Sequence, residues 1–141
     1  MNFEIRIYDG VGPIRFGMTP NEVRTTLGVE FKSFRRTTEE THPCDYFTGL
    51  QCFVYYDDTN GRVEAVEFAE PAEPTLIGIN MLRLGFADLL RQIKELDPEV
   101  IVESDGFTSL SLGVGGWAPS AEEEPTVPCE SVIVFVRGYY D

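Results

Sequence analysis

The amino-acid sequence predicts an α+β fold, in which a mostly antiparallel sheet carries two helices on one face. Two segments, residues 19–28 and 86–97, show the apolar spacing and end signals of short amphipathic helices. The segments around them are rich in aromatic and β-branched residues, often alternating with polar ones, which is typical of strands. Because 141 residues is a usual size for one domain, we expect a single domain over residues 1–141.

The first expected elements are a strand over residues 3–8 and a short helix. Residues 3–8 alternate apolar and polar side chains over most of their length. Thr19 can cap the helix start, Pro20 suits its first position, and Glu22 completes a capping box. Gly28 favours a C-terminal stop. These signals predict a helix that begins at Pro20 and ends just before Gly28.

Residues 51–69 predict a β-hairpin. The first strand is aromatic and β-branched, and Asn60-Gly61 supplies turn residues suited to a positive φ. Strand alternation places Tyr55 and Tyr56 on opposite faces of the sheet. Only one of these two tyrosines can therefore lie in the core of a sheet that is covered on one side.

The second half of the chain predicts a helix followed by two strands. The apolar face of that helix is formed by Phe86, Leu89, Leu90, Ile93 and Leu96. Residues 107–112 alternate as a strand, and residues 131–136 form the apolar run of a central strand. Between these strands, residues 113–130 are rich in Gly, Pro and Glu, and we expect a long loop there.

The two halves share an order of elements. Residues 1–73 and 74–141 each offer a strand, a helix and two strands, and Val66 and Val134 occupy similar places. Residue identity between the halves is poor. The pattern predicts a degenerate tandem repeat of strand–helix–strand–strand units.

Charge narrows the classes of partner. The formal net charge is −13, and residues 95–136 contain nine carboxylates but no Lys or Arg. Nucleic acids and anionic membranes repel such a chain, so we expect neither as a partner. A basic protein is the partner that this charge favours.

The basic residues leave one alternative open. Lys32, Arg35 and Arg36 cluster in the N-terminal part of the chain. This cluster can pair with the acidic half of the same chain or of a second copy, in a homodimer.

The location expected for the chain is cytoplasmic. Its first residues show no signal-peptide pattern, and no stretch approaches the ~20 apolar residues of a membrane-spanning helix. The odd number of cysteines, three, does not suggest a secreted disulfide framework.

Residues 17–28 carry a family resemblance. They read G-M-T-P-N-E-V-R-T-T-L-G, which is similar to the G-M-T-x-x-E-V-x-x-x-L-G signature of small domains shaped like the β-lactamase inhibitory protein. Outer-membrane assembly lipoproteins share this signature, and the whole acidic chain resembles the immunity partners of bacterial polymorphic toxins. The chain departs from these groups in having neither a lipoprotein leader nor paired cysteines in each half. The resemblance implies a protein-binding domain whose sheet face grips another protein, and it assigns no individual binding residue.

The sequence contains no recognisable catalytic or metal-binding constellation. His42, Cys44, Cys52 and Cys129 are the only imidazole and thiols, and their spacing matches no usual zinc site. The glycine-rich residues 113–116 are not followed by a helix, which argues against a nucleotide loop. We therefore expect no enzyme activity, no metal and no cofactor.

The function expected from these observations is that of an immunity protein, which neutralises a bacterial toxin or effector through an acidic surface. The alternatives are a small carboxylate-dependent hydrolase and an assembly domain resembling the outer-membrane lipoproteins. The residues predicted to contact the partner are Tyr55, Asp57, Asp58, Glu64, Glu67, Trp117, Glu122, Glu123 and Glu124. Reversing the charges of Glu122, Glu123 and Glu124 together is predicted to abolish binding.

Overall fold

The fold is described from a computed structural model that covers residues 1–141, all of which are described. The elements are β1 (Phe3–Arg6), β2 (Gly10–Val11), β3 (Ile14–Arg15), α1 (Pro20–Leu27), β4 (Lys32–Phe34), β5 (Cys44–Phe47), the 3₁₀-helix η1 (Thr48–Leu50), β6 (Cys52–Tyr56), β7 (Val63–Ala69), β8 (Pro74–Leu76), β9 (Ile79–Asn80), α2 (Phe86–Leu96), β10 (Ile101–Glu103), β11 (Gly106–Ser109), β12 (Val114–Trp117) and β13 (Ser131–Phe135).

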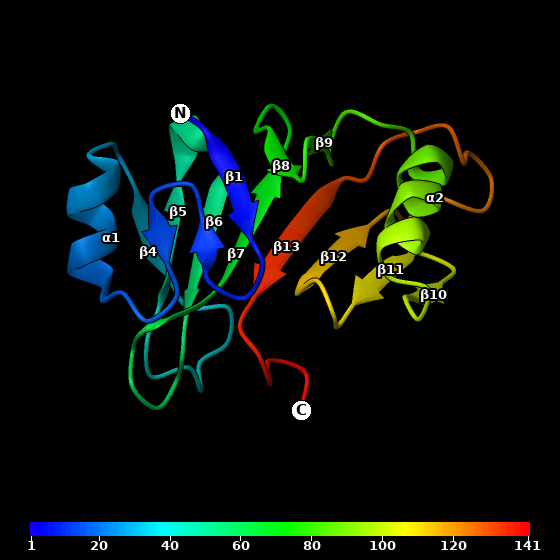
Figure 1. Cartoon of the computed structure of the whole chain (residues 1–141). Helices are drawn as coiled ribbons and strands as arrows, with labels where there is room; N and C mark the ends of the chain where they lie inside the picture. The colour runs from blue at the N-terminus through cyan, green and yellow to red at the C-terminus, as the bar shows by residue number, and fades with distance from the viewer.

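The larger of two sheets runs through the whole molecule. Its eight strands follow the order β10-β11-β12-β13-β7-β6-β5-β4, and every neighbouring pair is antiparallel (Figure 1). Each half of the chain contributes a four-stranded meander, and the last strands of the two halves, β7 and β13, meet at the centre. The predicted α+β class with a mostly antiparallel sheet is confirmed.

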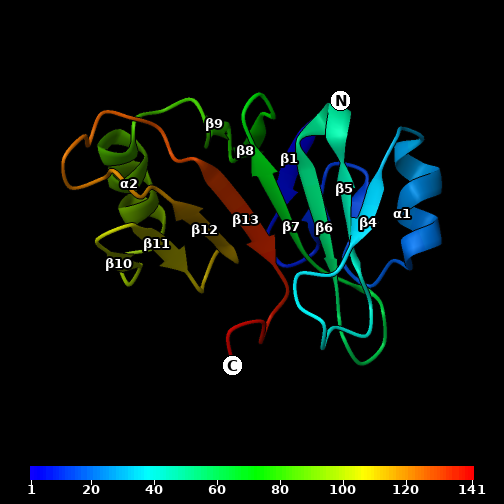
Figure 2. The same ribbon diagram turned by 180° about the vertical axis from the view of Figure 1, so that it is seen from behind.

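A second layer covers one face of this sheet. It consists of α1, α2 and a small five-stranded sheet of order β3-β2-β1-β8-β9, in which β1 and β8 form the one parallel pair. Figure 2 looks onto the opposite face, with β1 behind the large sheet. The prediction of two helices on one face is confirmed. The opposite face of the large sheet is the surface that we call the open face.

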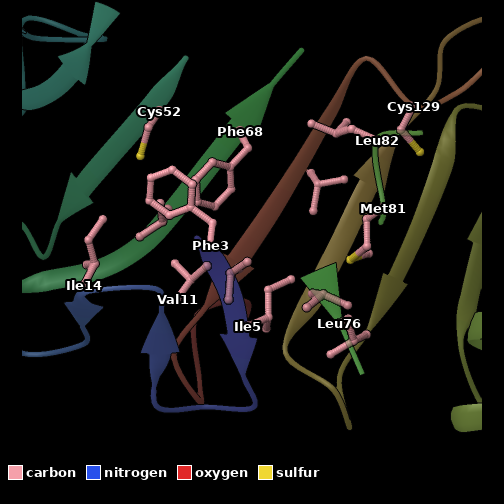
Figure 3. Close-up of a cluster of buried hydrophobic side chains, with 14 of the residues drawn as sticks. Phe3, Ile5, Val11, Ile14, Cys52, Phe68, Leu76, Met81, Leu82 and Cys129 are labelled. Carbon is pink, nitrogen blue, oxygen red and sulfur yellow. The ribbon is translucent and has the colours of Figure 1, made fainter. Parts of the chain in front are cut away.

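The core lies between the two layers and is shared by both halves. One cluster of 26 buried residues includes side chains from β1, β2, β7 and β8, and from β12 and β13. In Figure 3, Phe3 and Phe68 pack against each other, with ring centroids 4.8 Å apart. Leu76 and Met81 of the second half lie close to Ile5 in the same cluster. The two halves therefore depend on one continuous core.

The local signals for α1 are confirmed. The Thr19 hydroxyl accepts a hydrogen bond from the Glu22 amide at 3.2 Å, and Glu22 Oε1 accepts one from the Thr19 amide at 3.1 Å. Gly28 ends the helix in the left-handed region, at φ 60°. Val23 and Leu27 are buried. This helix is scaffold, because its capping groups bond to its own backbone.

A buried polar network ties α1 to the large sheet. Asp45 on β5 is 0% exposed and accepts hydrogen bonds from Arg24 at 2.8 and 2.9 Å. Ser33 and Tyr56 donate the remaining two, at 2.5 and 2.7 Å. Burial is the main cause of the raised pKa of Tyr56, and the hydrogen bond from Tyr56 to Asp45 raises that pKa further. No buried side-chain nitrogen or oxygen of this network lacks a hydrogen-bond partner, and the network links α1 to β5.

The periodicity of α2 is largely confirmed. Phe86, Leu89 and Ile93 are buried, Leu90 is half-buried and Leu96 is exposed. Neither helix of the molecule has the length and apolar character that spanning a membrane requires.

The prediction of a long loop over residues 113–130 is wrong for residues 114–117. Val114–Trp117 form β12, an interior strand between β11 and β13. The glycines allow close packing there, because a Cβ on Gly116 would lie 2.6 Å from a Phe107 ring carbon and 2.9 Å from Cys129 Sγ. The expected strand over residues 107–112 also ends earlier, at Ser109.

Candidate partner-binding site

The open face carries a cluster of aromatic side chains over its first half. The rings of Tyr46 and Phe53 stack at 4.2 Å between centroids, and Phe53 continues towards Tyr55 at 6.4 Å. Tyr55 itself is buried in a small second cluster that includes Ala65 and Phe135. Of the two adjacent tyrosines, Tyr56 therefore faces the main core and Tyr55 the open face, where other side chains cover it.

Arg36 is a basic residue that packs against the aromatic cluster of this face. The guanidinium carbon of Arg36 lies 4.2 Å from the centroid of the Tyr55 ring, and Arg36 forms an ion pair with Glu40 at 2.8 Å. Burial lowers the pKa of Arg36, but the hydrogen bond and charge of Glu40 outweigh it and leave that pKa raised. Arg36 therefore pairs with a carboxylate four residues further along the chain and not with the acidic second half.

The second half of the open face contains a pocket of about 250 Å³. Strands β7, β10, β11, β12 and β13 and the C-terminal tail contribute its lining. The lining residues are Glu67, Glu103, Asp105, Gly106, Phe107, Thr108, Gly115, Gly116, Trp117, Ser131, Ile133 and Tyr140. Gly115 has no side chain between Ile133 and Thr108, which leaves the backbone of β12 open to the pocket.

The pocket is acidic. Glu67, Glu103 and Asp105 supply three carboxylates, and no Lys, Arg or His is among the lining residues. The Tyr55 hydroxyl donates a hydrogen bond to Glu67 Oε1 at 2.6 Å and so fixes the Glu67 side chain. Tyr140 is only partly shielded from solvent, and this partial burial, followed by the Glu67 charge, raises the pKa of its hydroxyl. The field in the pocket therefore favours a cation.

Two aromatic side chains border the pocket and remain exposed. Trp117 is 49% exposed and Tyr140 is 56% exposed. The backbone of Trp117 is fixed by its pairing with Gly106 and Ser131, and its carbonyl accepts a hydrogen bond from the Glu130 amide at 2.8 Å. Exposed aromatic rings on a rigid strand are typical of the anchors of protein interfaces.

The structure brings three of the predicted partner-binding residues to this face: Tyr55, Glu67 and Trp117. The Tyr55 ring is buried, and its hydroxyl donates the hydrogen bond that holds Glu67 in place. Trp117 was expected in a loop and lies instead at the end of β12. Glu67 and Trp117 line the same pocket, although 50 residues separate them in the sequence.

Two further predicted residues, Asp57 and Asp58, lie at the turn between β6 and β7, and Glu64 is the second residue of β7. The Asp57 carboxylate accepts hydrogen bonds from the amides of Thr59 and Asn60, and Asp58 accepts one from the Thr41 amide. Glu64 is half-buried, and burial, followed by the charge of Asp57, raises its pKa. The two aspartates thus organise the turn and the loop beside it.

The predicted run Glu122, Glu123 and Glu124 lies elsewhere. All three are exposed in the segment between β12 and β13, which passes beside α2 in Figure 1. The Ala87 amide of α2 donates a hydrogen bond to the Pro125 carbonyl at 2.9 Å, which attaches this segment to the helix. None of the three glutamates lines the pocket.

Glu103, Asp105 and Tyr140 line the pocket but were not among the predicted partner-binding residues. Glu103 and Asp105 belong to the acidic stretch of the second half. The feature that could have indicated them is the position of Glu103 at the end of β10, just before the turn to β11. Tyr140 carries no such signal, because the tail reaches the pocket only after the chain has folded.

The three thiols are buried, and the imidazole packs against a turn. Cys44, Cys52 and Cys129 are all buried, and burial raises the pKa of Cys52 to about 12 and that of Cys129 to about 11. The His42 ring packs over Gly61 in the β6–β7 turn. No group of three or more His, Cys, Asp or Glu side chains is arranged to hold a metal ion.

The fold and the pocket together describe an α+β protein with one covered and one open sheet face, whose open face offers carboxylates beside exposed aromatic rings. Comparisons of the chain with protein-family models, with curated proteins and with solved structures find no match.

Proposed function

We propose that the chain is a non-catalytic binding protein of the immunity type, which neutralises a basic toxin or effector domain by holding it against the open face. The observation that carries this proposal is the acidic pocket bordered by Trp117 and Tyr140. The proposal also draws on the resemblance of residues 17–28 to protein-binding domains.

Charge and exposed aromatic surface support a protein as the partner. A net charge of −13 attracts basic surfaces over a distance set by the Debye length, which is longer at low salt, and accelerates encounter. Once the surfaces meet, the exposed ring of Trp117 offers the apolar contact that dominates affinity in many interfaces. Long-range steering and a central aromatic anchor are thus available on one face.

Neutralisation would follow from occlusion. A toxin that acts on an anionic substrate presents basic side chains in its active site. Carboxylates such as Glu67, Glu103 and Asp105 would take the place of that substrate. Each well-desolvated charge pair would be worth about 2–5 kcal/mol when one partner is truncated.

The test begins with capture of partners by the purified chain, followed by expression of the captured protein on its own. We expect a stable complex, loss of the partner's toxic activity on binding, and an affinity that falls as salt rises. Trp117→Ala should weaken the complex by at least about tenfold. A captured partner whose activity is unchanged in the complex would contradict neutralisation.

A further inference from the structure

The first half of the open face shows how this molecule binds a guanidinium. Arg36 lies over the Tyr55 ring at 4.2 Å, and its charge is met by Glu40 at 2.8 Å. Tyr139 of the C-terminal tail adjoins the same group, since the charge of Arg36 lowers the pKa that burial raises in Tyr139. An aromatic face, a carboxylate and a tail tyrosine therefore surround one arginine.

The register of the sheet identifies the equivalent place in the second half. Val54 pairs with Val66 on β7, and Val114 pairs with Val134 on β13. The next residues, Tyr55 and Gly115, therefore occupy equivalent positions on the open face. Where the first half has a tyrosine ring with Arg36 upon it, the second half has a glycine and the pocket.

The pocket repeats the chemistry that surrounds Arg36, with groups from other strands. Trp117 supplies the aromatic face, Tyr140 follows Tyr139 in the same tail, and Glu67, Glu103 and Asp105 supply carboxylates. The lining includes no cation of the chain's own. We infer that this pocket is a binding site for a single arginine side chain presented by a partner protein, an inference that rests on the proposed function.

Arginine fits this site better than lysine on physical grounds. The guanidinium is planar and stacks on aromatic rings, and its donors fan out in a plane towards several acceptors. Glu67 comes from β7, whereas Glu103 and Asp105 lie together at the end of β10 and in the turn before β11, so carboxylates line the pocket from two separate parts of the sheet. A lysine ammonium is a more strongly hydrated point charge and gains less from the aromatic border.

The experiment uses the full chain and its only tryptophan, Trp117, as the reporter. Tryptophan fluorescence is followed while the peptide acetyl-Gly-Arg-Gly-amide is added, with matched peptides that carry lysine or citrulline. The arginine peptide should give a saturable change with a dissociation constant in roughly the millimolar range, as suits one side chain. The lysine peptide should bind several-fold more weakly. Citrulline, which keeps the shape but lacks the charge, should give no saturable change.

Variants then locate the binding. Glu67→Gln and Asp105→Asn should each weaken the arginine peptide at least about threefold. Glu122→Gln removes the same charge beside α2 and should leave the dissociation constant unchanged. Gly115→Ala places a methyl group in the floor, 3.2 Å from the Phe107 carbonyl oxygen and 3.3 Å from Ile133 Cγ2, and should also weaken binding. If Gly115→Ala fails to fold, the two charge variants still decide the question.

The inference is overturned if citrulline binds as well as arginine, or if Glu67→Gln and Asp105→Asn leave arginine binding unchanged. A failure of the peptide, combined with a captured partner that still depends on Trp117, would remove the arginine site and leave the proposed function intact. If the arginine peptide binds but no open-face variant weakens binding of the captured partner, the arginine site stands and the proposed function is contradicted.

Discussion

Val66 and Val134 lie directly opposite each other at the centre of the large sheet, in the pairing between β7 and β13. They are 68 residues apart, and the strand order is the same on either side of them. An antiparallel pair of equivalent residues lies on a local two-fold axis. The molecule is thus organised as two similar halves joined through their last strands, with one core beneath both.

Truncation of either valine at this junction should destabilise the whole molecule. Both side chains are 0% exposed, so Val66→Ala or Val134→Ala removes buried methyl groups and should cost about 2 kcal/mol. Because the core is continuous, urea unfolding followed by circular dichroism should show one transition with an unchanged slope. Two separate transitions in either variant would mean that the halves unfold independently.

The buried network around Asp45 should contribute more to stability than any surface ion pair. Asp45→Ala leaves the Arg24 guanidinium without its carboxylate, and we expect a loss of about 3–5 kcal/mol. The control is Glu73→Ala, which removes the exposed pair with Arg83 and should change stability by less than about 1 kcal/mol. Equal losses in the two variants, measured by chemical denaturation, would show that burial of the Asp45 network is not decisive.

The second half has a polar link at the same topological position. Asp45 pairs with Val54 across β5 and β6, and Ser109 pairs with Val114 across β11 and β12. The Ser109 hydroxyl donates a hydrogen bond at 2.7 Å to Asp97, which caps the end of α2. Each half therefore attaches its helix region to the second strand of its meander through a buried hydrogen bond.

How far the sequence predicts this structure depends on whether the signal is local. The capping box of Thr19 and Glu22 lies within four residues, so α1 could be predicted to its ends. β12 could not, because its glycines are favoured by packing against Phe107 and Cys129, which only the folded sheet brings together. Of the residues that line the pocket, only Glu67 and Trp117 were predicted to contact a partner. The others are brought together by pairing between distant strands and by the C-terminal tail.

Gly116→Ala tests the packing reason for the glycines of β12. Its new Cβ would overlap the Phe107 ring and Cys129 Sγ, and overpacking of this kind costs about 1–3 kcal/mol. Gly49→Ala is the matched control, because a Cβ there meets nothing within 4 Å. Thermal unfolding should separate the two variants clearly. If Gly116→Ala is as stable as Gly49→Ala, close packing does not explain the glycine strand.

Glu64 should make stability depend on pH in a defined direction. Burial, followed by the charge of Asp57, raises the Glu64 pKa above its ordinary value of 4.5. The folded state therefore holds this proton more tightly than the unfolded state. The stability that this tighter proton binding contributes is fully present below pH 4.5 and is lost as pH rises through the raised pKa. Glu64→Gln should remove that loss, so its stability relative to the parent chain should increase from pH 4 to neutral pH and then level off. A difference in unfolding free energy that is the same at every pH would contradict the shift.

We expect the open face to hold the partner, in contrast to the sequence prediction that placed an essential contact at Glu122, Glu123 and Glu124 beside α2. Two charge-matched triple variants separate these surfaces, since each changes the net charge from −13 to −10. One combines Glu67→Gln, Glu103→Gln and Asp105→Asn in the pocket, and the other combines Glu122→Gln, Glu123→Gln and Glu124→Gln. The equilibrium dissociation constant for the captured partner is measured with both. We expect a loss of at least about 100-fold for the pocket variant and only a few-fold loss for the other. A large loss confined to the variant at residues 122–124 would contradict binding through the open face.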